Sequence, residues 1–102
     1  MASLAAHQDF PNESAYAGAM HAVIGMARSQ DLELRDRGIR VCTVSPGLVR
    51  TELTERSGFS AADLAQALPA EAVAATIWHS IETIRQGGYI ADVLHLPGGV
   101  RY

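Results

Sequence analysis

A long apolar helix followed directly by a β-branched strand is the feature that most limits how this chain can fold. Residues 14–37 read as one helix, and its first half is apolar or small at nearly every position. A helix without a polar face is expected to be buried on all sides. Residues 39–44 have the pattern of a strand buried on both faces, which is typical of a parallel sheet. Gly38, between the two, suits the end of a helix.

A second helix and a second strand repeat this arrangement. Residues 69–86 predict a helix that begins at Pro69, because the first helical position needs no backbone donor. One apolar stripe runs along this helix and is made of Val73, Ile77, Ile81 and Ile84. Residues 90–96 then predict a strand. The stretch 48–68 between the two units has only short helical signals, and we expect it to be a mobile lid over a substrate.

The predicted order is therefore helix, strand, lid, helix, strand, in a single domain spanning residues 1–102. This order pairs two parallel strands with a helix between them. We expect residues 1–13 to form a leading loop, with Asn12 or Ser14 capping the first helix. Two acid–base pairs in that helix have the i,i+4 spacing of stabilising ion pairs. They are Asp31 with Arg35 and Glu33 with Arg37.

Composition argues against several classes of function. The formal net charge is −3 and all eight basic residues are scattered arginines, so neither nucleic acid nor an anionic membrane is an expected partner. No apolar run approaches the roughly 20 residues of a membrane span. The single cysteine, Cys42, allows no disulfide framework and fits a reducing compartment. We therefore expect a cytoplasmic protein. The four histidines lack metal-ligand spacing, so we expect no metal site.

Three motifs occur together in the order that a known family uses. Ser3 precedes Tyr16 by thirteen residues, the strand after the tyrosine helix ends in Pro46-Gly47, and Thr51 follows four residues after that glycine. The chain resembles the short-chain dehydrogenase/reductase family, whose catalytic element is a serine, then Tyr-x-x-x-Lys, then a strand and a Pro-Gly cofactor loop. The resemblance implies the C-terminal portion of a Rossmann-like, doubly wound parallel sheet of the α/β class.

The resemblance also implies roles for individual residues. Ser3 and Tyr16 would bond the oxygen of a small-molecule alcohol or carbonyl substrate, and the tyrosine would pass its proton. Four loop residues would contact NAD or NADP, namely Pro46, Gly47, Val49 and Thr51. The plainer reading of the same residues is a surface serine, a tyrosine at the edge of the core, and a turn with Thr51 as a helix cap. The helix cap is compatible with the cofactor contact.

Two departures from the family weaken the prediction of catalysis. In the family, a lysine one turn after the tyrosine holds the nicotinamide ribose and supplies positive charge beside the phenol. Met20 occupies that position here, and methionine carries no charge. The residues also contain no Gly-x-Gly-x-x-Gly dinucleotide fingerprint. We therefore expect the family's N-terminal nucleotide-binding half to be absent and the chain to be a truncated or catalytically impaired oxidoreductase.

Two other functions stay open at this point. The chain is also consistent with a non-catalytic protein that forms a homo-oligomer through the 14–37 helix, because its small residues allow a second helix to approach closely. It is equally consistent with one half of a split oxidoreductase, in which a separate N-terminal half pairs with the open edge of the 39–44 strand.

Overall fold

The structure, a computed structural model, describes residues 1–90 and 92–95. In chain order the elements are η1 (Leu4–Ala6), α1 (Ser14–Leu34), η2 (Arg35–Arg37), β1 (Thr43–Pro46), β2 (Val49–Arg50), α2 (Glu52–Arg56), α3 (Ala61–Gln66), β3 (Leu68–Pro69), α4 (Ala70–Arg85) and β4 (Asp92–His95). η1 and η2 are single 3-10 turns.

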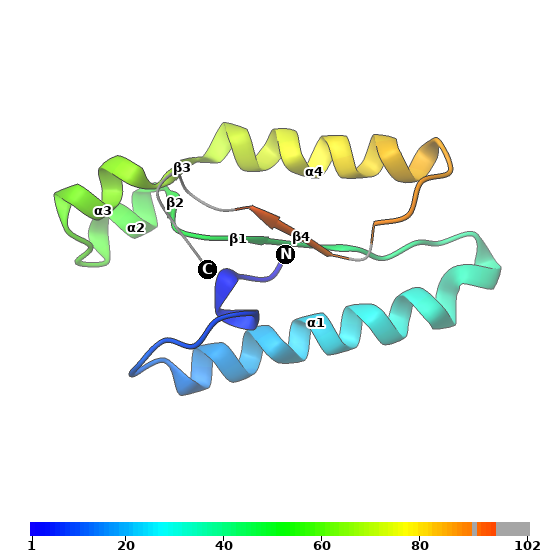
Figure 1. Cartoon of the computed structure of the whole chain (residues 1–102), viewed down its shortest axis with the longest axis horizontal. Helices are drawn as coiled ribbons and strands as arrows, with labels where there is room; N and C mark the ends of the chain where they lie inside the picture. The colour runs from blue at the N-terminus through cyan, green and yellow to red at the C-terminus, as the bar shows by residue number, and fades with distance from the viewer. Residues whose placement is uncertain (91, 96–102) are drawn as a thin grey trace.

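Three layers make up the architecture. β1 and β4 pair in parallel with Thr43 opposite Asp92, while α1 lies on one face of this pair and α4 lies on the other (Figure 1). The predicted α/β class, the parallel pairing and the order of the main elements are therefore confirmed. β4 lies within the predicted strand 90–96, of which positions 91 and 96 fall outside the described residues.

The first strand starts later than predicted. We expected residues 39–44, but β1 covers Thr43–Pro46. Its partner β4 begins only at Asp92, so the preceding residues lack a described strand beside them and make no ladder. On the other edge of β1, the backbone N–H of Ala2 donates to the carbonyl of Val44 at 2.9 Å. This bond holds the start of the chain against the sheet.

The first helix is less buried than its sequence suggested. α1 buries only Ile24, Ala27 and Asp31, whereas Met26 on the opposite side is 60% exposed. The prediction of burial on all sides is wrong, because the described elements cover only one side of this helix. Even so, no helix among the described residues is long and apolar enough to cross a membrane.

The ends of α1 differ from the prediction in detail. The N-cap residue is Glu13, which makes no side-chain capping bond, while Asn12 takes a left-handed conformation at φ 63°. The predicted caps, Asn12 and Ser14, are therefore wrong. At the other end the chain tightens into η2 and stops at Gly38, whose φ of 76° favours glycine, as predicted.

A buried carboxylate ties the end of α1 to the segment that enters β1. Asp31 is only 4% exposed and accepts hydrogen bonds from Arg35 (2.8 Å), from Arg40 (3.0 Å) and from the backbone N–H of Val41 (2.8 Å). The bonds from Arg40, and then those from Val41 and Arg35, hold the pKa of Asp31 well below its usual range. The predicted Asp31–Arg35 pair is confirmed.

The second predicted ion pair of this helix does not form. No described contact joins Glu33 to Arg37. Arg37 belongs to the tighter η2 turn, which changes the i,i+4 spacing that the pair requires.

The 48–68 stretch contains more regular structure than the sequence indicated. β2 and β3 form a second parallel pair, and the N–H of Leu68 donates to the carbonyl of Leu48 at 2.8 Å. Two short helices lie between these strands, capped by the side chains of Thr51 and Ser60. The role of this stretch as a lid stays a prediction. The helix that follows, α4, begins at Ala70, one residue later than predicted, with Pro69 as its N-cap.

Candidate active site

One cavity of about 620 Å³ lies at the carboxyl end of β1, where open parallel sheets bind ligands. Its walls come from the start of the chain, the first turn of α1, the loop after β1, the short helix α2 and Phe59 just after it. All six residues predicted to form the catalytic and cofactor site line this cavity. They are Ser3, Tyr16, Pro46, Gly47, Val49 and Thr51.

Ser3 is placed by the 3-10 turn that it caps. Its hydroxyl oxygen accepts a hydrogen bond from the backbone N–H of Ala5 at 3.2 Å. The turn is buried, with Ala5 only 2% exposed, so this part of the predicted leading loop is fixed against the core, whereas residues 9–13 are exposed. No described acceptor binds the hydroxyl proton of Ser3. The serine can therefore donate that proton to an oxygen in the cavity.

Tyr16 stands in the first turn of α1 and is 49% exposed. Its phenol makes no hydrogen bond to any described residue, so both its donor and its acceptor are available to a ligand. Met20, one turn further, does not line the cavity. It packs instead against a small core cluster formed by Ala2, Ala6 and Ile24. The position that carries lysine in the resembling family therefore serves the core in this chain.

The loop after β1 forms one wall of the cavity. Pro46 closes the strand and is buried, and Gly47 follows it without a side chain that would fill the space. Thr51 accepts a bond from the N–H of Thr54 at 3.2 Å, and the N–H of Thr51 donates back to the Thr54 hydroxyl at 2.8 Å. This capping box confirms the helix-cap reading of Thr51. The same residue still lines the cavity.

The remaining walls of the cavity are mostly apolar. They include Leu4, Phe10, Leu48, Leu53 and Phe59, and Glu13 is the one charged side chain among the described residues that line it. The cavity therefore offers hydroxyls, backbone groups and apolar surface, which suit an uncharged carboxamide ring and a neutral substrate. Among the described residues that line it there is neither a lysine, an arginine nor a glycine-rich helix start for a pyrophosphate. These residues fit the nicotinamide end of a dinucleotide and do not fit its phosphates.

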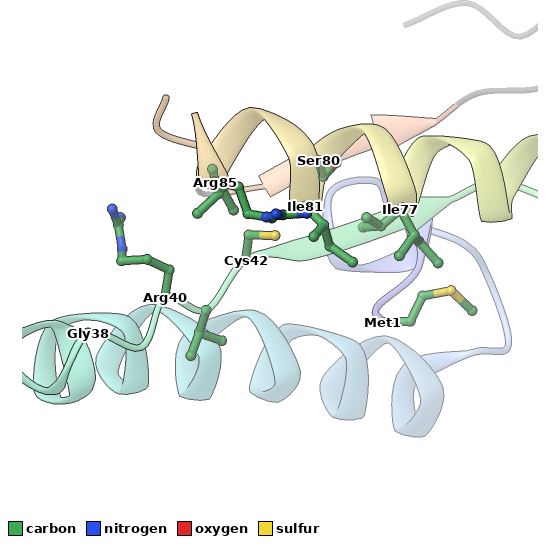
Figure 2. A pocket seen from close by; sticks show the side chains of 11 residues that line it. Met1, Gly38, Arg40, Cys42, Ile77, Ser80, Ile81 and Arg85 are labelled. Atoms are coloured by element: carbon green, nitrogen blue, oxygen red, sulfur yellow. The ribbon is translucent and has the colours of Figure 1, made fainter. Parts of the chain in front are cut away.

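A second opening, also of about 620 Å³, lies between α4 and the segment that leads into β1 (Figure 2). In Figure 2 Ile77, Ile81 and Arg85 come from α4, Cys42 comes from the segment leading into β1, and Met1 comes from the start of the chain. This opening runs along residues 40–42 and Val44, and no described strand lies beside residues 40–42. Burial and the nearby charges of Asp31 and Asp92 raise the pKa of the Cys42 thiol, so it is not an activated nucleophile.

Comparisons with known proteins agree on one family of enzymes. A family profile described as enoyl-(acyl carrier protein) reductase matches residues 1–85. Among curated proteins, (+)-cis,trans-nepetalactol synthase of Nepeta racemosa is 44% identical over 48 residues, which cover 47% of this chain and 18% of that protein. Levodione reductase of Leifsonia aquatica is 36% identical over 56 residues, which cover 55% of this chain and 21% of that protein.

A solved structure extends the likeness to nearly the whole chain. 4-Hydroxyisoleucine dehydrogenase complexed with NADH superposes with a TM-score of 0.80 at 25% sequence identity. The match covers 95% of this chain and 44% of the dehydrogenase. The chain thus spans less than half of the solved enzyme, and its matched stretch spans about a fifth of the curated relatives.

Proposed function

The chain belongs to the short-chain dehydrogenase/reductase family, and we propose that it forms the substrate-facing, C-terminal part of an NAD(P)-dependent oxidoreductase. The reaction would interconvert a small alcohol and its carbonyl compound. The observation that carries this proposal is the gathering of Ser3, Tyr16 and the Pro46–Thr51 loop around one cavity. These residues come from three separate segments, so a chance cluster of one local motif does not account for the arrangement.

The proton chemistry falls to two hydroxyl groups. We infer that Tyr16 gives a proton to the carbonyl oxygen during reduction, or takes it from the alcohol during oxidation. Ser3 would donate a hydrogen bond to the same oxygen and hold it near the phenol. The free phenol of Tyr16 and the unused proton of Ser3 support these roles.

The loop after β1 would hold the nicotinamide end of the cofactor. Pro46, Gly47, Val49 and Thr51 line the wall on which the carboxamide would bind, and their backbone groups and the Thr51 hydroxyl would supply the hydrogen bonds. The bound nicotinamide supplies or accepts the hydride. The NADH complex of the similar dehydrogenase supports a nicotinamide cofactor, and both NAD and NADP remain within the proposal.

Substituting Ser3 tests the proposed site. We expect Ser3→Ala to lower the oxidoreduction rate by about 10- to 100-fold, because the substrate oxygen loses one positioned donor. The assay follows NAD(P)H absorbance in a protein that joins this chain to a nucleotide-binding half from the family. Ser3→Thr keeps the hydroxyl and the cap of η1, and should retain most of the rate. Ser29→Ala, on the exposed side of α1, is the matched control. An unchanged rate in Ser3→Ala would contradict the proposed role.

The exposed side of α1 supports a second proposal, that copies of this chain associate through this helix. Small and apolar residues at i, i+4, i+7 and i+11 form one exposed stripe, which we call the outer α1 stripe. It consists of Ala15, Ala19, Ala22 and Met26. Such a stripe lets a second helix pack closely and removes apolar surface from water.

A charge placed in the middle of the outer α1 stripe should break this association. We expect Ala22→Glu to lower the association constant by about 100-fold or more, because it would bury an unpaired carboxylate. Sedimentation velocity at micromolar concentration measures the change. Ala75→Glu introduces the same charge at an exposed alanine of α4 and should leave association intact. A wild-type chain that sediments as a monomer would rule out association through this face.

Among the described residues, only the N–H of Ala2 bonds to the edge of β1 away from β4, which favours the split-enzyme reading over an independent domain. A two-stranded sheet is marginal by itself, and residues 40–42 line an apolar opening beside it. A nucleotide-binding half that adds a parallel strand there would extend the sheet and supply the missing phosphate site. The non-catalytic oligomer and the split enzyme differ in one respect, since only the split enzyme gains dinucleotide binding when the second half is added.

A further inference from the structure

A partly buried polar cluster joins three elements next to the proposed site. The Nε2 atom of His7 lies 2.8 Å from Oδ2 of Asp92 and 3.2 Å from Oγ of Ser45. The other carboxylate oxygen, Oδ1 of Asp92, accepts hydrogen bonds from the hydroxyls of Thr43 and Ser45. Ser45 has no exposed surface, and the side chains of His7 and Asp92 are 21% and 13% exposed. We call these four residues the His7 cluster.

The donors and acceptors of the His7 cluster determine where the histidine proton lies. A carboxylate only accepts hydrogen bonds, so each partner of Asp92 must be a donor. Ser45 donates its proton to Asp92 at 3.1 Å and therefore presents a lone pair to His7. Both contacts of the imidazole thus require a hydrogen on Nε2.

The same geometry excludes a nucleophilic serine. In a Ser–His–Asp relay the two imidazole nitrogens serve the serine and the carboxylate separately. Here one nitrogen, Nε2, contacts both Ser45 and Asp92. Ser45 is also closed off from any substrate. The cluster therefore holds structure in place and does not attack a substrate.

The His7 cluster anchors η1, the turn that carries Ser3. Ser3 is the N-cap of η1 and His7 is its C-cap, with only three residues between them. The Ser3 end is fixed by the bond from Ala2 to Val44, and the His7 end is fixed by the cluster. Ser45 in turn directly precedes Pro46 of the cofactor loop. One network therefore sets the distance between the serine wall and the loop wall of the cavity.

We propose that His7 is a positioning residue that orients Ser3 relative to the loop after β1 through its Nε2–H bonds to Asp92 and Ser45. The catalytic consequence depends on the proposed function, whereas the anchoring of η1 does not. A single 3-10 turn has little stability of its own, so it requires a tertiary anchor at each end. Without the His7 donor, the Asp92 carboxylate and the Ser45 lone pair each lose a partner.

Substituting His7 with glutamine or with asparagine distinguishes the hydrogen bonds of its Nε2 atom from the packing of its side chain. A glutamine side chain carries its amide nitrogen about as far from the backbone as Nε2 of histidine, whereas asparagine reaches only the Nδ1 position. His7→Gln should therefore restore the two bonds, and His7→Asn and His7→Ala should not. His79→Ala, at an exposed histidine of α4, is the matched control.

Native-state hydrogen exchange of the 102-residue chain measures the stability of η1 directly. The amides of Ala6 and Gln8, which bond to the carbonyls of Ser3 and Leu4, report on its integrity. We expect both amides to exchange about tenfold faster or more in His7→Ala and His7→Asn, and within about threefold of wild type in His7→Gln. His79→Ala should not change them. Equal exchange in all variants, or equal rescue by asparagine and glutamine, would overturn the proposal.

The catalytic half of the proposal uses the same variants. In the chain joined to a nucleotide-binding half, His7→Ala and His7→Asn should lower kcat about tenfold with little change in the KM for the dinucleotide, and His7→Gln should recover it. Altered exchange with unchanged kcat would overturn the positioning role. If no variant and no wild-type protein shows activity, the proposed function fails, and the exchange pattern still decides whether His7 anchors the turn.

Discussion

Met20→Lys is expected to raise the oxidoreduction rate by about 100-fold or more in a protein that joins this chain to a nucleotide-binding half. Tyr16 must exchange a proton with the substrate oxygen, and a cation one helical turn away stabilises its ionised form. Methionine at this position provides no charge. Substitution therefore adds the electrostatic element that the rest of the cavity lacks.

The surroundings of Met20 can accept this change. Its side chain packs against Ala2, Ala6 and Ile24, but it is only partly buried. The methylene groups of a lysine can keep these contacts while the ammonium group extends towards the cavity and water. We therefore expect a small loss of stability and a large gain in rate.

Two control variants make the result specific to charge and to Tyr16. Met20→Gln has a polar side chain of similar length without charge and should gain little. In a Tyr16→Phe background, Met20→Lys should gain nothing, because no phenol remains to be assisted. Equal rates for the methionine and lysine forms would mean that Tyr16 is activated in another way or takes no part in the reaction.

Asp31→Asn is expected to cause the largest loss of stability among single polar substitutions in the chain. The asparagine can still accept one bond from the N–H of Val41, but the charge that binds Arg35 and Arg40 is gone. This anchor connects the end of α1 to the strand segment, so its loss loosens two layers together. We expect the melting temperature to fall by roughly 5 °C or more at neutral pH.

The pH dependence of this loss follows from the lowered pKa of Asp31. A carboxyl whose pKa is lower in the folded state than in the unfolded state stabilises the fold above its unfolded value, about 4, and loses this contribution as the pH falls below that value. The difference between wild type and Asp31→Asn should therefore be full at pH 7 and shrink progressively below pH 4.

Thermal unfolding monitored by circular dichroism at pH 7 and at pH 3 measures both parts of this prediction. Asp36→Asn, one turn further along at an exposed carboxyl, is the control and should unfold like wild type. A difference between wild type and Asp31→Asn that persists unchanged at pH 3 would show that the aspartate acts through its shape and not through its charge.

Local sequence patterns were enough to predict the order of the main elements. The helices 14–37 and 69–86 and the two strands appear within a few residues of their predicted bounds, because Gly38, Pro69 and the apolar patterns act locally. The pairing of β2 with β3 was not foreseen, since each strand has only two residues and carries no periodicity. The exposure of α1 depends on which elements cover it, and the apolar content of the helix alone does not reveal that.

For the proposed site too, residues in sequence motifs were predicted and contacts between distant residues were not. Ser3, Tyr16 and the Pro46–Thr51 loop were predicted because the resembling family keeps them at fixed spacings. The His7 cluster was missed, because His7 and Asp92 are far apart in the sequence and neither belongs to a motif. Asp31 was expected to pair only with Arg35, and its bonds to Arg40 and Val41 depend on how the chain turns after α1.

Titrating the purified 102-residue chain with NADH in a calorimeter tests the central claim most directly. The described cavity fits only the nicotinamide end of the cofactor, and the chain has no dinucleotide fingerprint. We predict that the chain alone binds NADH with a Kd weaker than about 1 mM, and that adding a nucleotide-binding half brings the Kd into the micromolar range. Micromolar binding of NADH by the chain alone would contradict this account.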